Sequence, residues 1–316
     1  MNLRHLRTFV TIADAGGIAR AGDRLNLSQP AASRQIATLE SDLGVKLFDR
    51  IGRRFRLSSE GEYLLRRSRR LLMDADSFTE EARALKKGQA GLLRVGASPQ
   101  VIESTLGTFL AHHRHRHPGI EVHLVEDGSV HLADRLARAD VHLALVASDD
   151  RFQQQSLFPL YVLAVMSKKH RLSRRGTLDI VELANESVLL LNRSFATREM
   201  FDAACSVTHI RPRVLLESTA AHTIIALASE NYGIAVVPSS GLISHDGVRA
   251  MPLVRRGVAV GSWVMVAWDP LRFLPPYAKE FVEELVIHCR RAHPGREFIR
   301  YARLPKPKEQ VKQSAK

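Results

Sequence analysis

The chain has few of the cysteines, metal-ligand patterns and long apolar runs that are typical of secreted, metal-stabilised and membrane-bound proteins. Its 316 residues include only two cysteines, Cys205 and Cys289, which form neither a CxxC pair nor a cysteine–histidine pattern of metal ligands. We therefore predict buried, inert thiols, and an oxidant-sensing role for Cys205 has no neighbouring motif to support it. No apolar run is long enough to span a membrane, and Arg4 and Arg7 interrupt the first apolar residues, so we expect a cytoplasmic protein without a signal peptide.

Motifs of catalysis are missing as well. The sequence contains no GxSxG, Walker A or HExxH pattern, so we predict no enzymatic activity. The histidine-rich run 112–117 could suggest a metal site, but of its histidines His113 and His117 alone share a helix face, and the intervening arginines repel cations. We interpret this run as a solvated helix end and expect no metal ion and no other cofactor.

The positive charge is concentrated at the two ends of the chain. The net charge is +13, with 17 lysines and arginines against 11 acidic residues in 1–87, and 9 against 2 in 288–316. Residues 88–287 are balanced, with 20 of each kind. A basic end attracts phosphates, whereas a large neutral body is typical of a ligand-holding domain. We interpret the last residues, 301–316, as a basic, disordered tail.

The first part of the chain predicts two helices joined by a tight turn. A helical stripe that begins at Leu3 stops at Gly16-Gly17, and a short helix is expected over 18–25. Asn26 can adopt the left-handed conformation that ends a helix, and Ser28 can cap the next helix, whose first turn tolerates a proline.

The helix that Ser28 caps has two chemically different faces. Four apolar positions that include Ile36 and Leu39 are expected to pack inward, while the opposite face is small, polar and cationic. A DNA major groove accepts such a helix, because bulky groups are absent near its N-terminus. A surface helix of an ordinary bundle is the alternative. The candidate DNA-binding residues here are Ser28, Gln29, Pro30, Ser33 and Arg34.

A β-hairpin wing is expected next, because apolar and basic residues alternate around Gly52. Its arginines would lie over a phosphate backbone, and Arg53 and Arg54 are candidate DNA contacts. Ser59-Glu60-Gly61-Glu62 then has the form of a capping box and opens a long helix over 60–88, followed by a linker.

The long helix carries a seam whose spacing alternates between four and three residues. Such a seam predicts a dimerisation helix, and two paired reading helices would engage two half-sites. An amphipathic helix that lies on the C-terminal domain is the alternative. The seam positions are Leu64, Ser68, Leu71, Ala75, Phe78, Ala82 and Leu85.

The run from Ala21 to Ile36, with Leu39-Glu40, Leu43-Gly44, Leu47-Phe48 and Arg50, resembles the DNA-binding domain of the LysR-type transcriptional regulators. The match is dense over about the first 65 residues. One departure is Gly22, where the family usually has alanine. The resemblance implies that Gln29, Pro30, Ser33, Arg34 and the wing residue Arg53 approach DNA.

The rest of the chain alternates between strands and helices, as in a doubly wound α/β domain. We expect strands over 92–97, 120–126, 141–146, 188–191, 213–216, 234–237 and 263–268, and helices over 98–117, 129–139, 196–207, 220–229 and 276–291. A second set of elements begins near Leu163. The chain crosses between two lobes more than once, which indicates a hinged binding cleft.

This half resembles the effector-binding domain of the same family, which is similar to periplasmic binding proteins. The stretch Tyr232–Pro238 carries the resemblance. One departure is Ala139-Asp140-Val141-His142, because the family usually shows a Gly-x-Leu-Asp-like stretch there. The fold expectation is unaffected, whereas contacts near the cleft are expected to differ.

Ligands of open α/β sheets bind at the carboxyl ends of strands, where helix N-termini favour anions. Hydroxyl and amide residues at such junctions are candidate effector contacts, although the same residue types also cap helices. A small anion such as a carboxylate is the expected effector. The candidates at the junctions are Ser98, Gln100, Ser129, Ser194, Phe195 and Thr197, and the resemblance adds Ala147, Ser148 and Thr219.

The sequence therefore predicts a sequence-specific DNA-binding transcription regulator that responds to a small molecule, with double-stranded promoter DNA and RNA polymerase as partners. Paired winged domains would form homodimers through the long helix, and dimers would reorient within a tetramer when the effector binds. A nucleoid-type DNA-binding protein or a solute-binding protein is the alternative. The predicted domains are 1–59 (winged helix-turn-helix), 60–88 (dimerisation helix), 91–162 with 267–300 (first effector lobe), 163–266 (second lobe) and the tail 301–316.

Overall fold

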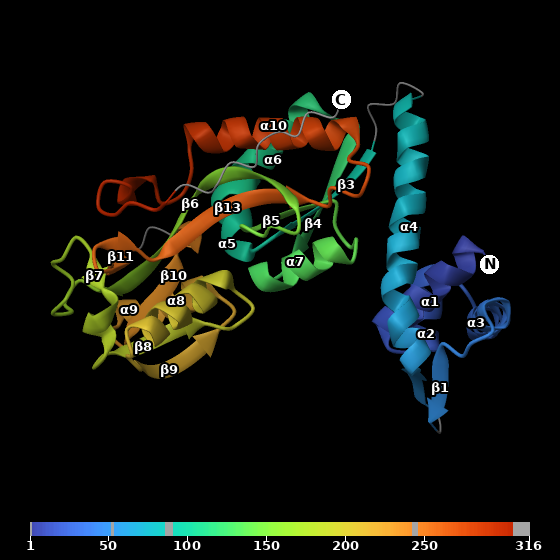
Figure 1. The fold of residues 1–316 in the computed structure, drawn as a ribbon, viewed down its shortest axis with the longest axis horizontal. Coiled ribbons are helices and arrows are strands. Elements are labelled where there is room, and N and C mark those ends of the chain that lie inside the picture. Colours follow the sequence, from blue (N-terminus) through green and yellow to red (C-terminus); the bar gives the residue numbers. More distant parts are fainter. Residues whose placement is uncertain (1, 52–53, 86–90, 242–245, 306–316) are drawn as a thin grey trace. The chain divides into compact units, whose positions relative to one another are not determined.

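The computed structural model describes residues 2–51, 54–85, 91–241 and 246–305 (Figure 1). The chain divides into two compact units, one holding Met1–Gly88 with Ala137–Asp140 and the other Gln89–Leu136 with Val141–Lys316. Every helix among the described residues is too short or too polar to span a lipid bilayer.

The first unit is a winged helix-turn-helix that continues into a long helix. Its elements are α1 (Leu3–Ala15), α2 (Ile18–Leu25), α3 (Gln29–Leu43), β1 (Phe48–Ile51), β2 (Arg54–Leu57) and α4 (Ser59–Leu85). The predicted ends of the first two helices are confirmed, because Gly16 and Asn26 both adopt left-handed conformations there. Phe9 of α1 and Leu39 of α3 are fully buried in the shared core, against which Leu72 of α4 also packs.

The long helix α4 begins with a different cap from the one that the sequence predicted. Ser58 holds the cap, because its Oγ accepts the N–H of Gly61 at 2.9 Å and donates to the carbonyl of Lys46 at 2.6 Å. The Ser59 hydroxyl instead donates to the carboxylate of Glu60. The predicted cap is therefore wrong by one residue, because Ser58, which is buried and bonded to the segment before the wing, caps the helix.

The second unit is built on one continuous mixed sheet with strand order β4-β3-β5-β13-β6-β10-β8-β9. Strand β11 also pairs with β6, and β7 and β12 pair with β11. The strands of this unit are β3 (Gly91–Ala97), β4 (Ile120–Glu126), β5 (Leu143–Ala147), β6 (Gln153–Ser167), β7 (Leu178–Asp179), β8 (Ser187–Leu191), β9 (Arg213–Ser218), β10 (Ile234–Pro238), β11 (Val248–Arg255), β12 (Val258–Ala259) and β13 (Gly261–Trp268). Its α-helices are α5 (Pro99–Val101), α6 (Gly107–Arg116), α7 (Ser129–Ala137), α8 (Ala196–Val207), α9 (Ala221–Ser229) and α10 (Pro276–Arg291). A π-helical turn, Ile102–Leu106, joins α5 to α6.

Strand β6 belongs to both lobes of this unit. Its first half, from Gln153 to Tyr161, pairs with β13, and its second half pairs with β10 and β11. The predicted lobe boundary at 266/267 falls inside β13, which pairs with β5 from Val264 onward. This pairing favours a boundary before Gly261.

Helices cover both faces of the sheet in each lobe (Figure 1). In the first lobe α6 and α10 share a core on one face, with Phe109 against Phe281, and α7 covers the other face. In the second lobe the side chains of β8 alternate, so that Leu189 joins the core under α9 and Leu190 joins the core under α8. This is the α/β arrangement that the sequence predicted.

Candidate nucleic-acid interface and ligand cavity

The start of α3 is set by its cap and its proline. The backbone of Ser28 is extended, its Oγ accepts the N–H of Ala31 at 3.4 Å, and Pro30 occupies the first turn. Gln29, Pro30 and Arg34 are exposed and Ser33 is half-buried. The face that the spacing predicted to point outward therefore does so, and its roles in DNA contact remain a prediction.

The inner side of α3 is held by polar contacts as well as by apolar packing. The hydroxyl of Thr8 on α1 donates to the amide oxygen of Gln35 at 2.6 Å. The Glu40 carboxylate accepts the N–H groups of Leu47 and Phe48 and the Lys46 ammonium at 2.7 Å. Burial alone would raise the pKa of Glu40, but these donors lower it below its usual value. Glu40 therefore fixes where the wing begins relative to α3.

Gly22, the residue that departs from the family pattern, lies buried on α2 beside the turn into α3. A Cβ at this position would lie 2.7 Å from the carbonyl oxygen of Leu27, which is closer than van der Waals contact permits. Helix α2 runs through Gly22 without a break. The glycine thus allows a close approach of the turn, and the outward face of α3 is unaffected.

The predicted wing is a two-stranded antiparallel hairpin in which Phe48 pairs with Leu57 and Ile51 with Arg54. Arg53, which is a predicted DNA contact, lies outside the described residues. Arg54, the other predicted contact, begins β2. Both assignments remain predictions.

The seam predicted on α4 divides into two parts. Near the start of the helix, Leu64 and Ser68 face the winged-domain core, because Ser68 is buried and Leu64 packs against that core. Farther along, the side chains of Leu71 and Phe78 are 46% and 73% exposed. Ala82 is also exposed, and the side chain of Leu85 lies outside the described part of the chain. Large exposed apolar groups at seam positions are typical of a helix that pairs with a partner.

A cavity of about 480 Å³ lies between the two lobes of the second unit, at the ends of strands. Four of the predicted effector residues line it: Gln100, Ser194, Phe195 and Thr219. The sequence reasoning missed its acidic and histidine residues, namely Glu103, Glu126, Asp127, His131 and His222, together with Asn192. Asp127 and Asn192 directly follow strands β4 and β8, so the strand-end rule could have identified them.

The other five predicted effector residues lie outside the set that lines the cavity. Ser98 precedes α5 and is buried without a capping bond, and Thr197 is buried in the first turn of α8. Ala147 is half-buried, and the exposed Ser148 accepts the side-chain amide of Gln154 at 3.0 Å. The fifth of them, Ser129, has a different task.

Ser129 joins the two lobes by a direct hydrogen bond. Its Oγ accepts the N–H of Ala196, the first residue of α8, at 2.8 Å, and the N–H of Val130 donates to the carbonyl of Ser194 at 3.0 Å. The backbones approach so closely that a Cβ on Gly128 would lie 2.4 Å from the Ser194 carbonyl oxygen. This edge of the cleft is therefore closed, and the N-terminus of α8 is capped by the opposite lobe.

Asp127 carries the main charge network of the cavity wall. Its carboxylate accepts hydrogen bonds from Arg135 at 2.7 Å, from His131 at 3.1 Å and from the N–H of Gly128. Burial alone would raise its pKa, but these donors lower the pKa below its usual value. The carboxylate is thus ionised and already paired at neutral pH.

His142 replaces the aspartate that the family pattern usually has, and its contacts are now defined. Its ring Nδ1 accepts the backbone N–H of Arg94 on β3 at 2.9 Å, and the backbone N–H of His142 donates to the carbonyl of Arg94. Burial first, and then the guanidinium groups of Arg94 and Arg272, lower the pKa of His142 from 6.5 to about 4. The neutral ring therefore serves as a fixed hydrogen-bond acceptor beside β3.

The histidine-rich run at the end of α6 differs from the expected solvated helix end. His112 and His115 are exposed, but His113 is 1% exposed and stacks on Phe109. The prediction is therefore wrong for His113, because the ring faces α10 instead of solvent.

Both cysteines are buried, as predicted. Burial, with a smaller effect from the negative charge of Asp202, raises the pKa of Cys205 to about 11, and burial raises that of Cys289 to about 12. Neither thiol is ionised near neutral pH, so neither resembles a reactive sensor cysteine.

A winged helix-turn-helix together with a two-lobed ligand cavity defines a ligand-responsive DNA-binding regulator. Residues 3–62 match the family described as "Bacterial regulatory helix-turn-helix protein, lysR family", and residues 86–290 match "LysR substrate binding domain". The chain belongs to the LysR family of transcriptional regulators.

Individual relatives agree along almost the whole chain. The uncharacterized HTH-type transcriptional regulator YybE of Bacillus subtilis (strain 168) is 27% identical over 297 residues, covering 91% of this chain and 99% of the relative. Full-length OxyR from Pseudomonas aeruginosa has a TM-score of 0.69 at 24% identity, with 92% and 98% of the chains covered. CbnR in complex with its target DNA has a TM-score of 0.62 at 24% identity, with 92% and 99% covered. The structural similarity at these identities shows the fold alone.

Proposed function

We propose that this LysR-family regulator contacts the bases of one DNA half-site with the N-terminal face of α3 and binds the flanking DNA phosphate backbone with its wing. The observation that carries this proposal is the exposed face of α3, where Gln29 and Arg34 stand beside the small residues Pro30 and Ser33. Gln29 can form paired hydrogen bonds with adenine and Arg34 with guanine, while Ser28, Arg53 and Arg54 are suited to phosphate contacts.

The second copy of the reading helix comes from a homodimer formed through α4, and two dimers form the tetramer. The exposed Leu71 and Phe78 on α4 support this pairing. RNA polymerase is the further partner of a regulator of this type. The regulator acts in the cytoplasm, the compartment that holds the DNA. It acts by binding alone, and no covalent bond is made or broken.

We place the effector in the 480 Å³ cavity between the lobes. Helix α9 begins there without a side-chain cap, so its first N–H groups, together with Thr219 and His222, can receive a carboxylate or another small anion. Glu103 and Glu126 line the same cavity, so a ligand that also carries a hydrogen-bond donor is favoured over a doubly charged anion.

The predicted effector residues then have two kinds of role. Gln100, Ser194, Phe195 and Thr219 contact the ligand directly. Ser98, Ala147, Ser148 and Thr197 shape the strand ends around it. Ser129, through its bond to Ala196, couples ligand binding to lobe closure.

Binding to the DNA upstream of the protein's own gene tests this function. Purified full-length chain is titrated against that DNA with an excess of random competitor, across a salt series. We expect retained specific binding with a steep salt dependence. The variant Arg34→Ala should weaken specific binding by about 5- to 150-fold, because one base contact contributes about 1–3 kcal/mol.

The matched control is Arg255→Ala, which removes one exposed positive charge from the other unit. If both variants behave alike, α3 does not read bases. If random competitor removes all wild-type binding, the protein acts as a nonspecific nucleoid-type binder, and if no DNA is bound at any salt concentration, the solute-binding alternative holds.

A further inference from the structure

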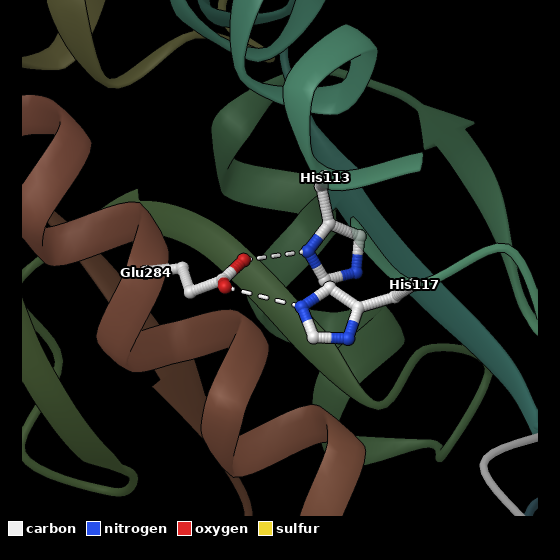
Figure 2. Close-up of side chains that lie close together, drawn as sticks. All are labelled: His113, His117 and Glu284. Carbon is white, nitrogen blue, oxygen red and sulfur yellow. Dashed lines mark hydrogen bonds and ion pairs between the residues drawn. The ribbon is translucent and has the colours of Figure 1, made fainter. Parts of the chain in front are cut away.

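Two histidines on α6 face a glutamate on α10 in the first lobe. His113 Nδ1 lies 2.8 Å from one oxygen of Glu284, and His117 Nε2 lies 3.1 Å from the other oxygen. Figure 2 shows both imidazole rings directed at the same carboxylate from one side. One ligand atom from each of these residues lies within 4.8 Å of the other two. These contacts bring together residues that are more than 160 positions apart in the sequence.

A fourth donor stands one helical turn away. Glu280 precedes Glu284 by four residues on α10, and its Oε1 lies 4.0 Å from His117 Nε2. The Glu280 side chain is 57% exposed and is free to turn toward the cluster. Two i, i+4 pairs, one of histidines and one of glutamates, thus face each other across the helix–helix contact.

The hydrogen bonds show where a cation would enter. An ionised carboxylate only accepts hydrogen bonds, so the ring nitrogens that face Glu284 both carry protons. Replacing these two protons by one metal ion leaves the nitrogen lone pairs and the carboxylate directed at a common point. In a tetrahedral site with bonds of about 2.0–2.1 Å the donors stand about 3.3 Å apart, so each histidine nitrogen needs to move away from its Glu284 oxygen by only a few tenths of an ångström. The three donor atoms already lie within 4.8 Å of one another.

We propose that His113, His117, Glu284 and Glu280 form a binding site for a divalent transition-metal ion of the Zn²⁺ class, which links α6 to α10. Two imidazole nitrogens with two carboxylates suit Zn²⁺, and the two carboxylates balance its charge. The site lies on the helical face of the first lobe and is distinct from the ligand cavity, whose lining shares none of these residues.

Two features of the cluster limit the affinity. A guanidinium nitrogen of Arg116 forms an ion pair with Glu284 at 2.9 Å, and its exposed side chain has to move away when the metal binds. The other nitrogen of His113, Nε2, is buried with no hydrogen-bond partner among the described residues, and it must take up the ring proton. The unpaired proton weakens binding by about 10- to 100-fold relative to a fully supported site, so we expect a dissociation constant on the order of micromolar.

Zinc competition with a chromophoric chelator on the full-length, tag-free chain tests the site. We expect one Zn²⁺ per chain, and a loss of at least about 30-fold in affinity for His117→Gln and for Glu284→Gln. The control His115→Gln removes an exposed histidine from the same helix end and should bind as the wild type does. His113 is left intact because its burial makes a substitution destabilising.

Arg116→Gln gives a result that adventitious binding to surface histidines would not. Because it removes a competing cation from Glu284, it should tighten zinc binding, on the order of 5-fold. With Co²⁺ as the probe, the wild type should show the intense visible absorption of a tetrahedral site. The proposal is wrong if the wild type takes up no zinc from the chelator, if His115→Gln loses as much affinity as His117→Gln, or if Arg116→Gln weakens binding.

Discussion

Acidification should destabilise the effector-binding unit through His142. Its ring is 9% exposed, and Nδ1 accepts the N–H of Arg94. A proton on Nδ1 would therefore face another donor, with the guanidinium groups of Arg94 and Arg272 nearby. The pKa is about 4 in the folded protein and 6.5 in the unfolded chain, so the unfolded state binds the proton first as the pH falls. The stability is fully present above pH 6.5 and is lost progressively from there down to about pH 4.

The expected size of this effect follows from the two pKa values. The free energy of unfolding should fall by about 2 kcal/mol between about pH 7.5 and about pH 5, and by about 3 kcal/mol once the pH is below both values. Denaturant unfolding followed by tryptophan fluorescence measures it, because both tryptophans, Trp263 and Trp268, lie on β13 beside β5. The fluorescence signal therefore reports on the unit that contains His142.

The matched variant is His142→Asn, whose side-chain oxygen can accept the same N–H but does not titrate. Other groups also titrate in this range, and comparison of the two proteins cancels their contribution. The variant should lose about 2 kcal/mol less than the wild type on going to about pH 5. Equal losses in both proteins would refute the assignment of a buried, neutral His142.

Three further predictions test other contacts. Glu40→Ala leaves the N–H groups of Leu47 and Phe48 unpaired and should lower the unfolding free energy of the winged domain by at least about 2 kcal/mol. Glu40→Gln keeps an acceptor and should lower this free energy less. Calorimetry compares the two variants, and equal losses would contradict the anchoring role of Glu40. Leu71→Glu with Phe78→Glu should convert dimers to monomers in sedimentation experiments, since each buried apolar side chain contributes about 1.5–3 kcal/mol; an unchanged oligomer would exclude this seam. Ser129→Ala should increase the hydrogen-exchange rate of the Ala196 amide by about 2- to 13-fold, and an unchanged rate would show that this bond does not hold the lobes.

Much of the fold could be predicted from the sequence because local signals mark its helices. Helices α8 and α10 have the predicted bounds, 196–207 and 276–291, residue for residue. Strand β6 was harder, since it begins at Gln153 and the prediction placed the second set of elements near Leu163. Its first residues are glutamines, whose polar side chains hide the strand.

Strand β11 (Val248–Arg255) escaped prediction for a related reason. It contains Pro252, a residue that is rare inside sheets because it cannot donate to a strand ladder. Its pairing with Leu163 of β6, almost 90 positions earlier in the chain, decides its conformation. Such long-range pairing overrides local preference and leaves no local signal.

The ligand cavity was predictable only in part. Ser194 was found because the strand-end rule points to it, Thr219 was implied by the family resemblance, and the outward face of α3 followed from helical spacing. His131 and His222 line the cavity from inside helices, where no sequence rule selects them. Their placement depends on how closely the lobes approach, as the contact of Gly128 with Ser194 shows.

The discontinuous first lobe has a consequence for the order in which the protein folds during synthesis. Its core joins residues such as Leu93 and Leu145 to Val264 on β13 and Phe281 on α10. The ribosome must therefore release nearly the whole chain before this core can close. The winged domain, whose core draws on nearby residues, can fold long before that, so a nascent regulator acquires its DNA-reading half well before it can sense a ligand.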